Sequence, residues 1–175
     1  DALYCDEKSS LLVRSTKTVM IDVFEFLIRW LSPIIPFTTE EAWQNWRECF
    51  AANEVVSCHL LERKKVPDNW NNDKLHEKWT KILEIKNAFT QSVEKKRNQK
   101  EIKSSLEAKA QIYLEDIEYK KVLQNIDLSE ILISSDVNIS ENFNDEFLFN
   151  SEDKKIGIKI LKDNGEKCPR CWKLF

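Results

Sequence analysis

Glycine and proline are scarce in this chain, with two glycines and four prolines among 175 residues. A β-sandwich or barrel needs many tight turns, and such turns use these two residues heavily. Apolar residues make up 42% of the sequence and include six tryptophans and nine phenylalanines, which is enough to build a core. The composition therefore predicts a mainly α-helical protein.

Charge and cysteine content limit the classes of function. The net charge of -3, from 27 basic and 30 acidic residues, gives no overall attraction to nucleic acid, so such a function needs a local basic patch. Five cysteines, three of them scattered, are not typical of a secreted disulfide framework. No apolar run approaches membrane-spanning length, and the chain starts at Asp1 with no signal peptide. We expect a cytoplasmic protein, with no membrane partner, that is part of a longer chain.

Two helices are predicted in the first fifty residues. Apolar side chains recur at helical spacing over residues 10–31, and prolines follow that segment. Thr38 and Glu41 then have the spacing of a capping box, in which Thr38 caps a second helix that reaches about residue 50. The order of these signals predicts an α-helical hairpin.

A third, longer helix is predicted after a polar loop. Asn71 or Asn72 can cap it, and the helix extends to about Arg97. Most of the tryptophans lie on apolar stripes of these three helices, and we expect them to be core residues. The residues expected on the stripe of the third helix are Leu75, Trp79, Ile82, Phe89 and Val93.

The pattern changes after Ser104. Residues 106–114 alternate between apolar and polar, as in a half-buried strand. A short helix is expected over 116–125, a second strand over 130–134 and a third over 156–160, while the acidic stretch 136–153 is typical of a mobile loop.

Three regions follow from these patterns. We expect a helical bundle over residues 1–103, a small β-α-β appendage with an acidic loop over 104–165, and half of a zinc-finger motif over 166–175. The fold class is mainly α, with a small C-terminal α/β appendage.

A C-x-x-C motif, Cys168 to Cys171, lies near the end of the chain. Two thiolates at this spacing are typical of half of a structural zinc site, with Zn–S distances of about 2.3 Å. The alternatives are two ordinary reduced cysteines or a thioredoxin-like redox pair. The remaining cysteines and histidines do not form a matching second pair; they are Cys5, Cys49, Cys58, His59 and His76.

A basic run ends the long helix, and its positive residues are Lys95, Lys96, Arg97, Lys100 and Lys103. Such a run can contact phosphates in a salt-sensitive way. The alternative is a solvated helix end whose cations suit the C-terminal dipole.

Trp172 differs from the other tryptophans because it lies beside the C-x-x-C motif, between Arg170 and Lys173. A solvent-facing indole can stack on an unpaired RNA base, so Trp172 and Arg170 are candidate RNA-binding residues. Catalytic signals are missing: the sequence has no P-loop, dinucleotide-binding turn, G-x-S-x-G or H-E-x-x-H motif. We find no catalytic centre in the sequence.

Four stretches together resemble a known family. They are residues 1–5 (DALYC), 29–43 (RWLSPIIPFTTEEAW), 94–108 and 168–172 (CPRCW). The second resembles the anticodon-binding helical domain of class I aminoacyl-tRNA synthetases, in the isoleucine, valine and leucine group. The last two narrow the resemblance to isoleucyl-tRNA synthetases of the bacterial type. Lys103 stands where that family commonly has glycine, and the family's second cysteine pair is missing.

The resemblance implies an antiparallel helical bundle that binds the anticodon stem-loop of isoleucine tRNA. It implies that Zn²⁺ binds Cys168 and Cys171 in the intact protein, which would be a monomer. Catalytic and editing domains would lie upstream in the same chain, and ATP and Mg²⁺ would bind there. The present residues would then be inactive alone.

Three alternatives stay open. The chain could be a helical protein-interaction module that does not bind RNA, and its acidic net charge favours this. It could be a small redox protein that uses Cys168 and Cys171. It could also be the anticodon-binding region of a valine or leucine enzyme.

Overall fold

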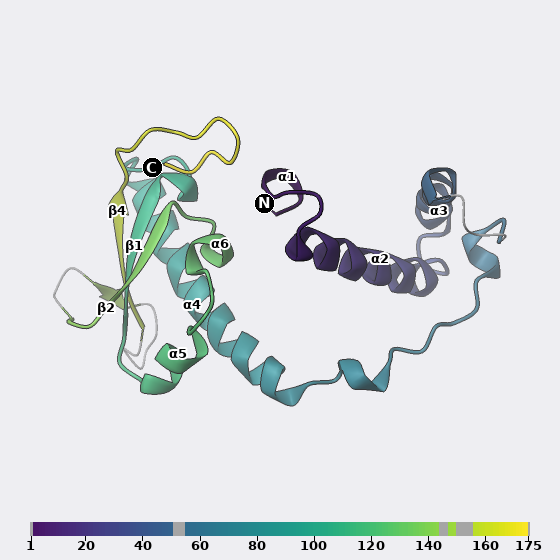
Figure 1. Ribbon diagram of the computed structural model, residues 1–175, viewed down its shortest axis with the longest axis horizontal. Helices are drawn as coiled ribbons and strands as arrows, with labels where there is room; N and C mark the ends of the chain where they lie inside the picture. The colour runs from purple at the N-terminus through teal and green to yellow at the C-terminus, as the bar shows by residue number, and fades with distance from the viewer. Residues whose placement is uncertain (1, 51–54, 144–146, 150–155, 175) are drawn as a thin grey trace. The chain divides into compact units, whose positions relative to one another are not determined.

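The computed structural model describes residues 2–50, 55–143, 147–149 and 156–174. The chain divides into two compact units, residues 1–71 and 72–175, which we describe separately. Figure 1 shows the order of helices and strands along the chain. None of the helices within the described residues is both long and apolar enough to span a membrane.

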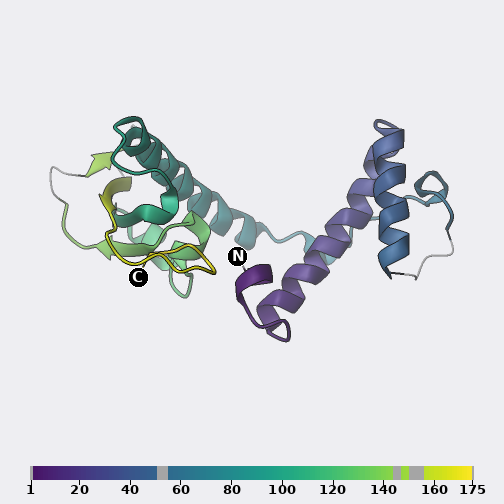
Figure 2. The same ribbon diagram turned by 90° about the horizontal axis from the view of Figure 1, so that it is seen from above.

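The first unit is a helical hairpin. A short helix, α1 (Ala2–Cys5), precedes α2 (Leu11–Leu31), and α3 (Pro36–Phe50) follows after a tight corner. Ser10 caps α2, because its hydroxyl accepts from the Val13 amide at 3.2 Å. Figure 2 shows α3 folded back beside the C-terminal half of α2. The predicted hairpin is confirmed.

The predicted capping box at Thr38 is wrong. The helix begins at Pro36, which favours the first helical position because it has no N–H to satisfy and its φ is already helical. Thr39 is buried inside the helix, and its hydroxyl donates to the carbonyls of Ile35 and Pro36. Thr38 and Thr39 therefore lie inside α3 and do not mark its start.

Trp43 is the centre of the small core of this unit. It is 1% exposed and packs with Ile28 and Cys58, and its indole N–H donates to the Val55 carbonyl at 3.2 Å. Cys58 begins a 3₁₀ turn, η1 (Cys58–Leu60), and a second turn, η2 (Asp68–Trp70), follows. The core thus fastens the segment after α3 to the hairpin.

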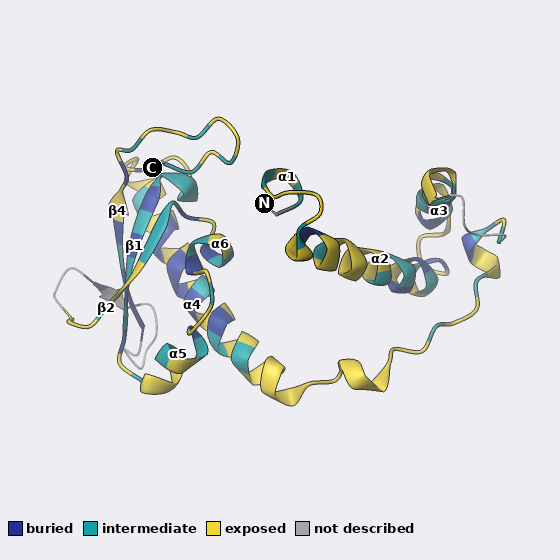
Figure 3. Cartoon of the chain, viewed as in Figure 1, coloured by how far each residue is buried: buried dark blue, intermediate teal, exposed yellow. Residues whose placement is uncertain are grey.

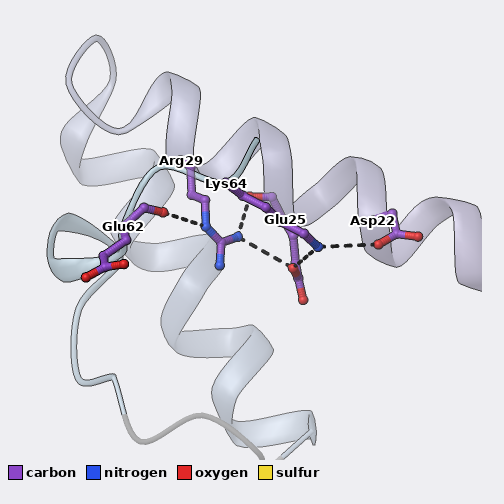
Figure 4. A network of polar contacts seen from close by, with 5 residues as sticks. All are labelled: Asp22, Glu25, Arg29, Glu62 and Lys64. Atoms are coloured by element: carbon purple, nitrogen blue, oxygen red, sulfur yellow. Dashed lines mark hydrogen bonds and ion pairs between the residues drawn. The ribbon is translucent and has the colours of Figure 1, made fainter. Parts of the chain in front are cut away.

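A polar network joins the same segment to α2 (Figure 4). Arg29 donates through Nε to the Glu62 carbonyl at 3.1 Å and through a terminal nitrogen to the Glu25 carbonyl at 2.7 Å. Lys64 Nζ lies 2.9 Å from Glu25 Oε2 and 3.6 Å from Asp22 Oδ1. The hydrogen bond with Glu25 raises the pKa of Lys64. These contacts hold residues 62–64 along one side of α2.

The second unit packs one long helix and two short ones against a sheet (Figure 1). The long helix is α4 (Asp73–Asn98), and Asn72 caps it by accepting from the Leu75 amide at 3.0 Å, as predicted. Its buried side chains lie in its C-terminal two thirds, whereas its first turns are exposed (Figure 3). Those buried in the core shared with the sheet are Ile82, Ile85, Ala88, Phe89 and Val93.

The sheet has strand order β2-β1-β4-β3. Its strands are β1 (Ala108–Leu114), β2 (Asp136–Ser140), β3 (Leu148–Phe149) and β4 (Ile156–Lys162). Strand β1 pairs parallel with β2 and antiparallel with β4, and β3 pairs antiparallel with β4. A parallel pair needs a long crossover, which α5 (Ile117–Val122) and α6 (Leu128–Leu132) supply. Alternate residues of β1 are buried against the helices, so the predicted alternation is confirmed.

The predicted strand over 130–134 is wrong, because these residues belong largely to α6. Asp127 caps α6 by accepting from the amides of Ser129 and Glu130, and Leu128 and Leu132 are buried one turn apart. Ile133, at φ 56°, then ends the helix. Four of the six residues 128–133 are apolar, a pattern that is compatible with either a strand or a helix. The Asp127 cap favours the helix.

The acidic segment is not a loop throughout, which corrects the second prediction for this region. Residues 136–140 form β2 and residues 148–149 form β3, while 144–146 and 150–153 lie outside the described residues. Phe147 is buried and Phe143 contacts the Tyr113 ring, with centroids 5.5 Å apart. Gly157 faces this aromatic cluster: a Cβ there would lie 3.2 Å from Phe147 Cβ.

The tryptophans are less buried than their helical spacing predicts. Trp43 is a core residue, but Trp30, Trp70 and Trp79 are 47%, 49% and 43% exposed. Leu75, also expected on the apolar stripe of α4, is 49% exposed. A stripe shows which side chains share one face of a helix, but it does not show whether another element covers that face.

The division between units falls at a different place from the boundary expected near Lys103. Helix α4 shares its core with β1 and β4, so it belongs to the second unit. The assignment of residues 1–103 to an antiparallel bundle stays a prediction. The coarser expectation, a mainly helical chain with a small sheet towards its C-terminus, is confirmed.

Candidate nucleic-acid interface

The basic end of α4 is partly neutralised by neighbouring acids. Lys96 Nζ lies 2.9 Å from Glu101 Oε2, and Arg97 lies 2.6 Å from Glu94 Oε1. Within the described residues Lys100 and Lys103 form no ion pair, and both are exposed. The positive charge is therefore least compensated in the turn after α4, where Lys100 adopts φ 59°.

That turn is held by the segment that follows it. Ser104 caps a 3₁₀ turn, η3 (Ser105–Glu107), and the Glu107 carboxylate accepts from the Lys103 amide at 3.0 Å. The Glu107 carbonyl accepts from the Asp163 amide at 2.8 Å, which fixes the turn to the end of β4. Two hydrogen bonds of Glu107 therefore fix the backbone here, one to Lys103 through its side chain and one to Asp163 through its carbonyl.

The C-terminal arm returns to the same place. Ser135 donates its hydroxyl to the Leu106 carbonyl, and the same hydroxyl accepts from the Leu174 amide at 2.8 Å. An isolated bridge pairs Lys167 with Leu174, so the Cys168–Cys171 turn forms the tip of a small hairpin. One side chain thus joins the turn after α4 to the arm that carries Trp172.

The two cysteines face one another across this tip. The backbone amides of Cys171 and Arg170, and the Cys171 thiol, donate to the sulfur of Cys168 and lower its pKa. Amide donors to a sulfur favour the thiolate, which is the form that binds a metal. No third cysteine, histidine or carboxylate within the described residues joins them at ligand distance. Zinc prefers four ligands, so the residues present fit half of a site.

A pocket of about 410 Å³ lies between the turn, the end of β4 and the arm. Its positive side chains are Lys100, Lys103, Lys162 and Lys167, and Trp172 and Asp163 also line it. The Lys167 ammonium lies 4.8 Å from the Trp172 ring centroid, and that ring is 60% exposed. Cations and an open aromatic face at one place are the combination that single-stranded nucleic acids bind.

The structure brings together only some of the predicted site residues. Lys100, Lys103 and Trp172 share the 410 Å³ pocket. Lys95 and Lys96 line a separate cavity of about 650 Å³ with Lys159. The remaining two predicted residues lie outside both cavities: Arg97 lines a third, and Arg170 lies exposed at the tip of the hairpin. The RNA-binding role of all of these residues stays a prediction.

Sequence reasoning missed three residues of the pocket: Lys162, Asp163 and Lys167. Lys162 is the last residue of β4, Asp163 follows it, and Lys167 lies in the arm. In the sequence they look like an ordinary polar turn, and no signal distinguishes them. Only the pairing of β4 with β1, and the return of the arm, places them beside the turn after α4.

A second group of polar side chains lies in the first unit. Ligand atoms of Glu40, Cys58 and His59 lie within 4.8 Å of one another. Glu40 accepts from Gln44, from the Ser57 hydroxyl at 2.8 Å and from the Cys58 amide at 2.9 Å. These hydrogen bonds, with that from Gln44 the strongest, lower the pKa of Glu40 to about 2. They fix its orientation without a metal, while burial raises the pKa of the Cys58 thiol.

Comparison with known proteins adds a finding to this geometry. The model of the family described as the anticodon-binding domain of tRNA ligase matches residues 1–113. The chain belongs to this anticodon-binding family. The match covers the whole first unit, α4 and most of β1. The predicted resemblance is confirmed.

Relatives of the anticodon-binding chain align over almost all of its length. An isoleucine–tRNA ligase of Bartonella henselae is 35% identical over 175 residues, and one of Pelagibacter ubique is 37% identical over 174 residues. A third, from Mesorhizobium japonicum, is 34% identical. Each alignment covers 99% of this chain but only 17–18% of the relative, so the chain spans about a sixth of the length of these ligases.

Proposed function

We propose that this chain binds the anticodon stem-loop of isoleucine tRNA as part of an isoleucine–tRNA ligase. The observation that carries the proposal is the alignment of 99% of the chain with isoleucine–tRNA ligases, together with the family match over residues 1–113. Charging of the tRNA with isoleucine, and the ATP and Mg²⁺ that it uses, would belong to the catalytic and editing domains of the same protein. The expected cytoplasmic location and monomeric state stay predictions.

The second unit supports RNA binding by its charge distribution. The protein as a whole is acidic, yet four lysines that form no ion pair among the described residues line one pocket between the end of α4 and the C-terminal arm: Lys100, Lys103, Lys162 and Lys167. Lysines fix phosphates and set the register of an RNA, while unpaired loop bases supply the specificity. A local cationic face on an acidic protein suits a stem-loop, because it limits non-specific attraction elsewhere.

A titration with two RNAs tests the proposal. The chain is titrated with an isoleucine anticodon stem-loop and with the same stem-loop carrying a different anticodon, each at 50 and 200 mM salt. We expect tighter binding to the native loop, and weaker binding of both at the higher salt. Equal affinity for the two loops would contradict the specificity, and no binding to either at low salt would contradict RNA binding by this chain.

The protein-interaction alternative gains a structural observation in its favour, besides the acidic net charge. Several large apolar side chains of α2 are exposed, among them Leu11, Val19, Met20 and Leu27. Exposed apolar faces of this kind mark interaction surfaces. A chain that functions only in this way would bind neither stem-loop at 50 mM salt, so the same titration separates the two functions.

The cysteine pair has its own role in the proposal. Cys168 and Cys171 would supply two of the four ligands of a structural Zn²⁺, and the ion would hold the tip of the arm in one conformation. The lowered pKa of Cys168 supports the thiolate form. A redox role would instead need a reversible disulfide, and substitution of both cysteines by serine distinguishes the two by metal content.

A further inference from the structure

We propose that Glu40, Cys58 and His59 form a binding site for one Zn²⁺ ion, with water as the fourth ligand. These residues lie in the first unit, and the proposal does not depend on RNA binding. Their ligand atoms all lie within 4.8 Å of one another, closer than any other three such groups in the described part of the chain. Glu40 lies on α3 and the other two begin η1, so the ion would join two elements.

The three ligand types select a borderline-soft divalent cation. Thiolate and imidazole are ligands that zinc and cobalt prefer, whereas Mg²⁺ and Ca²⁺ need a shell of oxygens. The Cys58 thiolate and the Glu40 carboxylate together carry two negative charges, which neutralise the charge of the ion in a partly buried site. Zinc sites with three protein ligands keep a water in the fourth position.

Glu40 is already oriented for this role. Its Oε2 accepts from the Ser57 hydroxyl at 2.8 Å and from the Cys58 amide at 2.9 Å, and its Oε1 accepts from Gln44 at 2.5 Å. A carboxylate has about four lone-pair sites, so these three hydrogen bonds leave one for a metal. Such bonds hold a ligating carboxylate in place, and little of its freedom is lost when the ion binds.

The thiol proton of Cys58 marks the position of the ion. Cys58 donates its S–H to the Glu40 carboxylate. A divalent cation between the sulfur and this oxygen replaces that proton, which leaves to the solvent as the Zn–S bond forms. Cys58 is 1% exposed and packs with Trp43 and Ile28, so the core holds its sulfur beside the carboxylate.

His59 completes the ligand set from the solvent side. It directly follows Cys58 and is exposed, which gives the ion a path from solvent. Zinc–ligand bonds of about 2.0–2.3 Å place tetrahedral ligands about 3.3–3.8 Å apart. The upper bound of 4.8 Å on the separations exceeds this by about 1 Å. Rotation of the exposed His59 side chain can supply a shift of this size.

A titration with Co²⁺ tests the site, because a cobalt–thiolate bond has its own charge-transfer absorption. The parent for this test carries Cys168→Ser and Cys171→Ser, which removes the other thiol pair as a competitor. Absorbance is followed as Co²⁺ is added, and Zn²⁺ is then added to displace it.

Two variants of the parent remove one ligand each, and two others are matched controls. His59→Ala removes an exposed ligand, and Cys58→Val removes the thiol but keeps an apolar side chain in the core. The controls are His76→Ala and Cys49→Ser, exposed residues of the same types outside the cluster. Circular dichroism melts confirm that each variant is folded.

We expect the parent to bind one Co²⁺ per chain, with a thiolate band that Zn²⁺ removes. Cys58→Val should abolish the band, and His59→Ala should weaken Co²⁺ binding by at least about tenfold, as even loss of an outer-shell partner does. Both controls should bind as the parent does. Zn²⁺ should also raise the melting temperature of the parent in a concentration-dependent way, but not that of Cys58→Val.

Three results would overturn the proposal. The first is a parent that shows no thiolate band in a large excess of Co²⁺. The second is a band that persists in folded Cys58→Val, and the third is binding that His76→Ala weakens as much as His59→Ala does, since the metal would then lie elsewhere. None of them bears on RNA binding, which the stem-loop titration tests separately.

Discussion

Trp43 and Trp30 differ in their surroundings, although both lie on helices of the first unit. Trp43 is 1% exposed and donates to the Val55 carbonyl, whereas Trp30 is 47% exposed. We expect Trp43→Ala to lower the free energy of unfolding by about 3–5 kcal/mol, since it leaves a cavity and an unpaired carbonyl. Trp30→Ala should cost about 1 kcal/mol because most of its loss is surface packing. Urea unfolding followed by circular dichroism measures both, and equal losses would contradict the assignment of Trp43 to the core.

Gly157 is a second residue at which a small change should have a large effect. An added Cβ would lie 3.2 Å from Phe147 Cβ and 3.4 Å from Tyr113 Cβ. We therefore expect Gly157→Ala to destabilise the second unit by about 1–3 kcal/mol through overpacking. In a Phe147→Gly background the same substitution should cost less, because the Phe147 Cβ that lies 3.2 Å from the added methyl is then absent. Additive losses in the double variant would show that the crowding lies elsewhere.

At the scale of elements, Glu40 couples α3 to the turn at Cys58. Its pKa in the folded chain is about 2, below the usual 4.5, so the folded state binds the proton less tightly than the unfolded state. The stabilisation is therefore present above about pH 4.5 and is lost as the pH falls towards 2. Because the carboxylate is partly exposed to solvent, we expect a contribution of about 1–2 kcal/mol.

Glu40→Gln provides the comparison for that pH dependence. The amide keeps the shape of the side chain but has no charge to lose between pH 4.5 and 2. Stability of the variant should therefore fall less over this interval than that of the wild type, as measured by thermal melts at several pH values. Parallel pH profiles would mean that other carboxylates dominate acid unfolding.

The sequence predicted elements best where one pattern was long and its ends were capped. Helices α2 and α4 and strands β1 and β4 were found because each repeats its spacing over seven residues or more, and Asn72 was also recognised as a candidate cap of α4. The short elements α6 and β2 were assigned wrongly because five residues hold little more than one helical turn, which is too short to separate helical from strand spacing. Their identity depends on the Asp127 cap and on pairing with β1, and pairing is a long-range contact that local spacing does not contain.

The candidate site was predictable in part for the same reason. Lys100, Lys103 and Trp172 were found because a basic run and an isolated tryptophan can be recognised from the sequence alone. Asp163 became visible only through its burial and its unpaired oxygen, which depend on the folded arrangement of β4 and the arm. The ion pairs of Lys96 and Arg97 were likewise hidden, since their acidic partners looked like general surface charge.

For the whole molecule, some cations near the end of α4 have a carboxylate partner and others have none. We therefore expect their substitution to change the salt dependence of RNA binding by different amounts. Substitution of Lys100 and Lys103 by glutamine should reduce the slope of log affinity against log salt by about 1–2, because these ammonium groups are free to neutralise phosphates. Substitution of Lys96 and Arg97 should reduce it less, because each already has a carboxylate partner. Stem-loop titrations at four salt concentrations measure both slopes.

A control pair lies on α5 of the same unit. Lys120 and Lys121 lie in the last turn of that helix and line none of the pockets described above, so their replacement by glutamine removes the same charge from another surface. We expect the slope to change by less than about 0.5 in this variant. An equal change in all three variants would mean that the chain attracts RNA by its total charge rather than through one face.

The hydrogen bonds of Ser135 affect how fast RNA would bind to the turn after α4 and the C-terminal arm. One hydroxyl bridges the Leu106 carbonyl and the Leu174 amide, so the lysine-bearing turn and the indole-bearing arm are joined before any RNA arrives. A preassembled surface has little conformational entropy left to lose on association. RNA should therefore associate at the rate set by diffusion and charge, without a slow rearrangement step. Removal of the Ser135 hydroxyl should change the association rate constant before it changes the affinity.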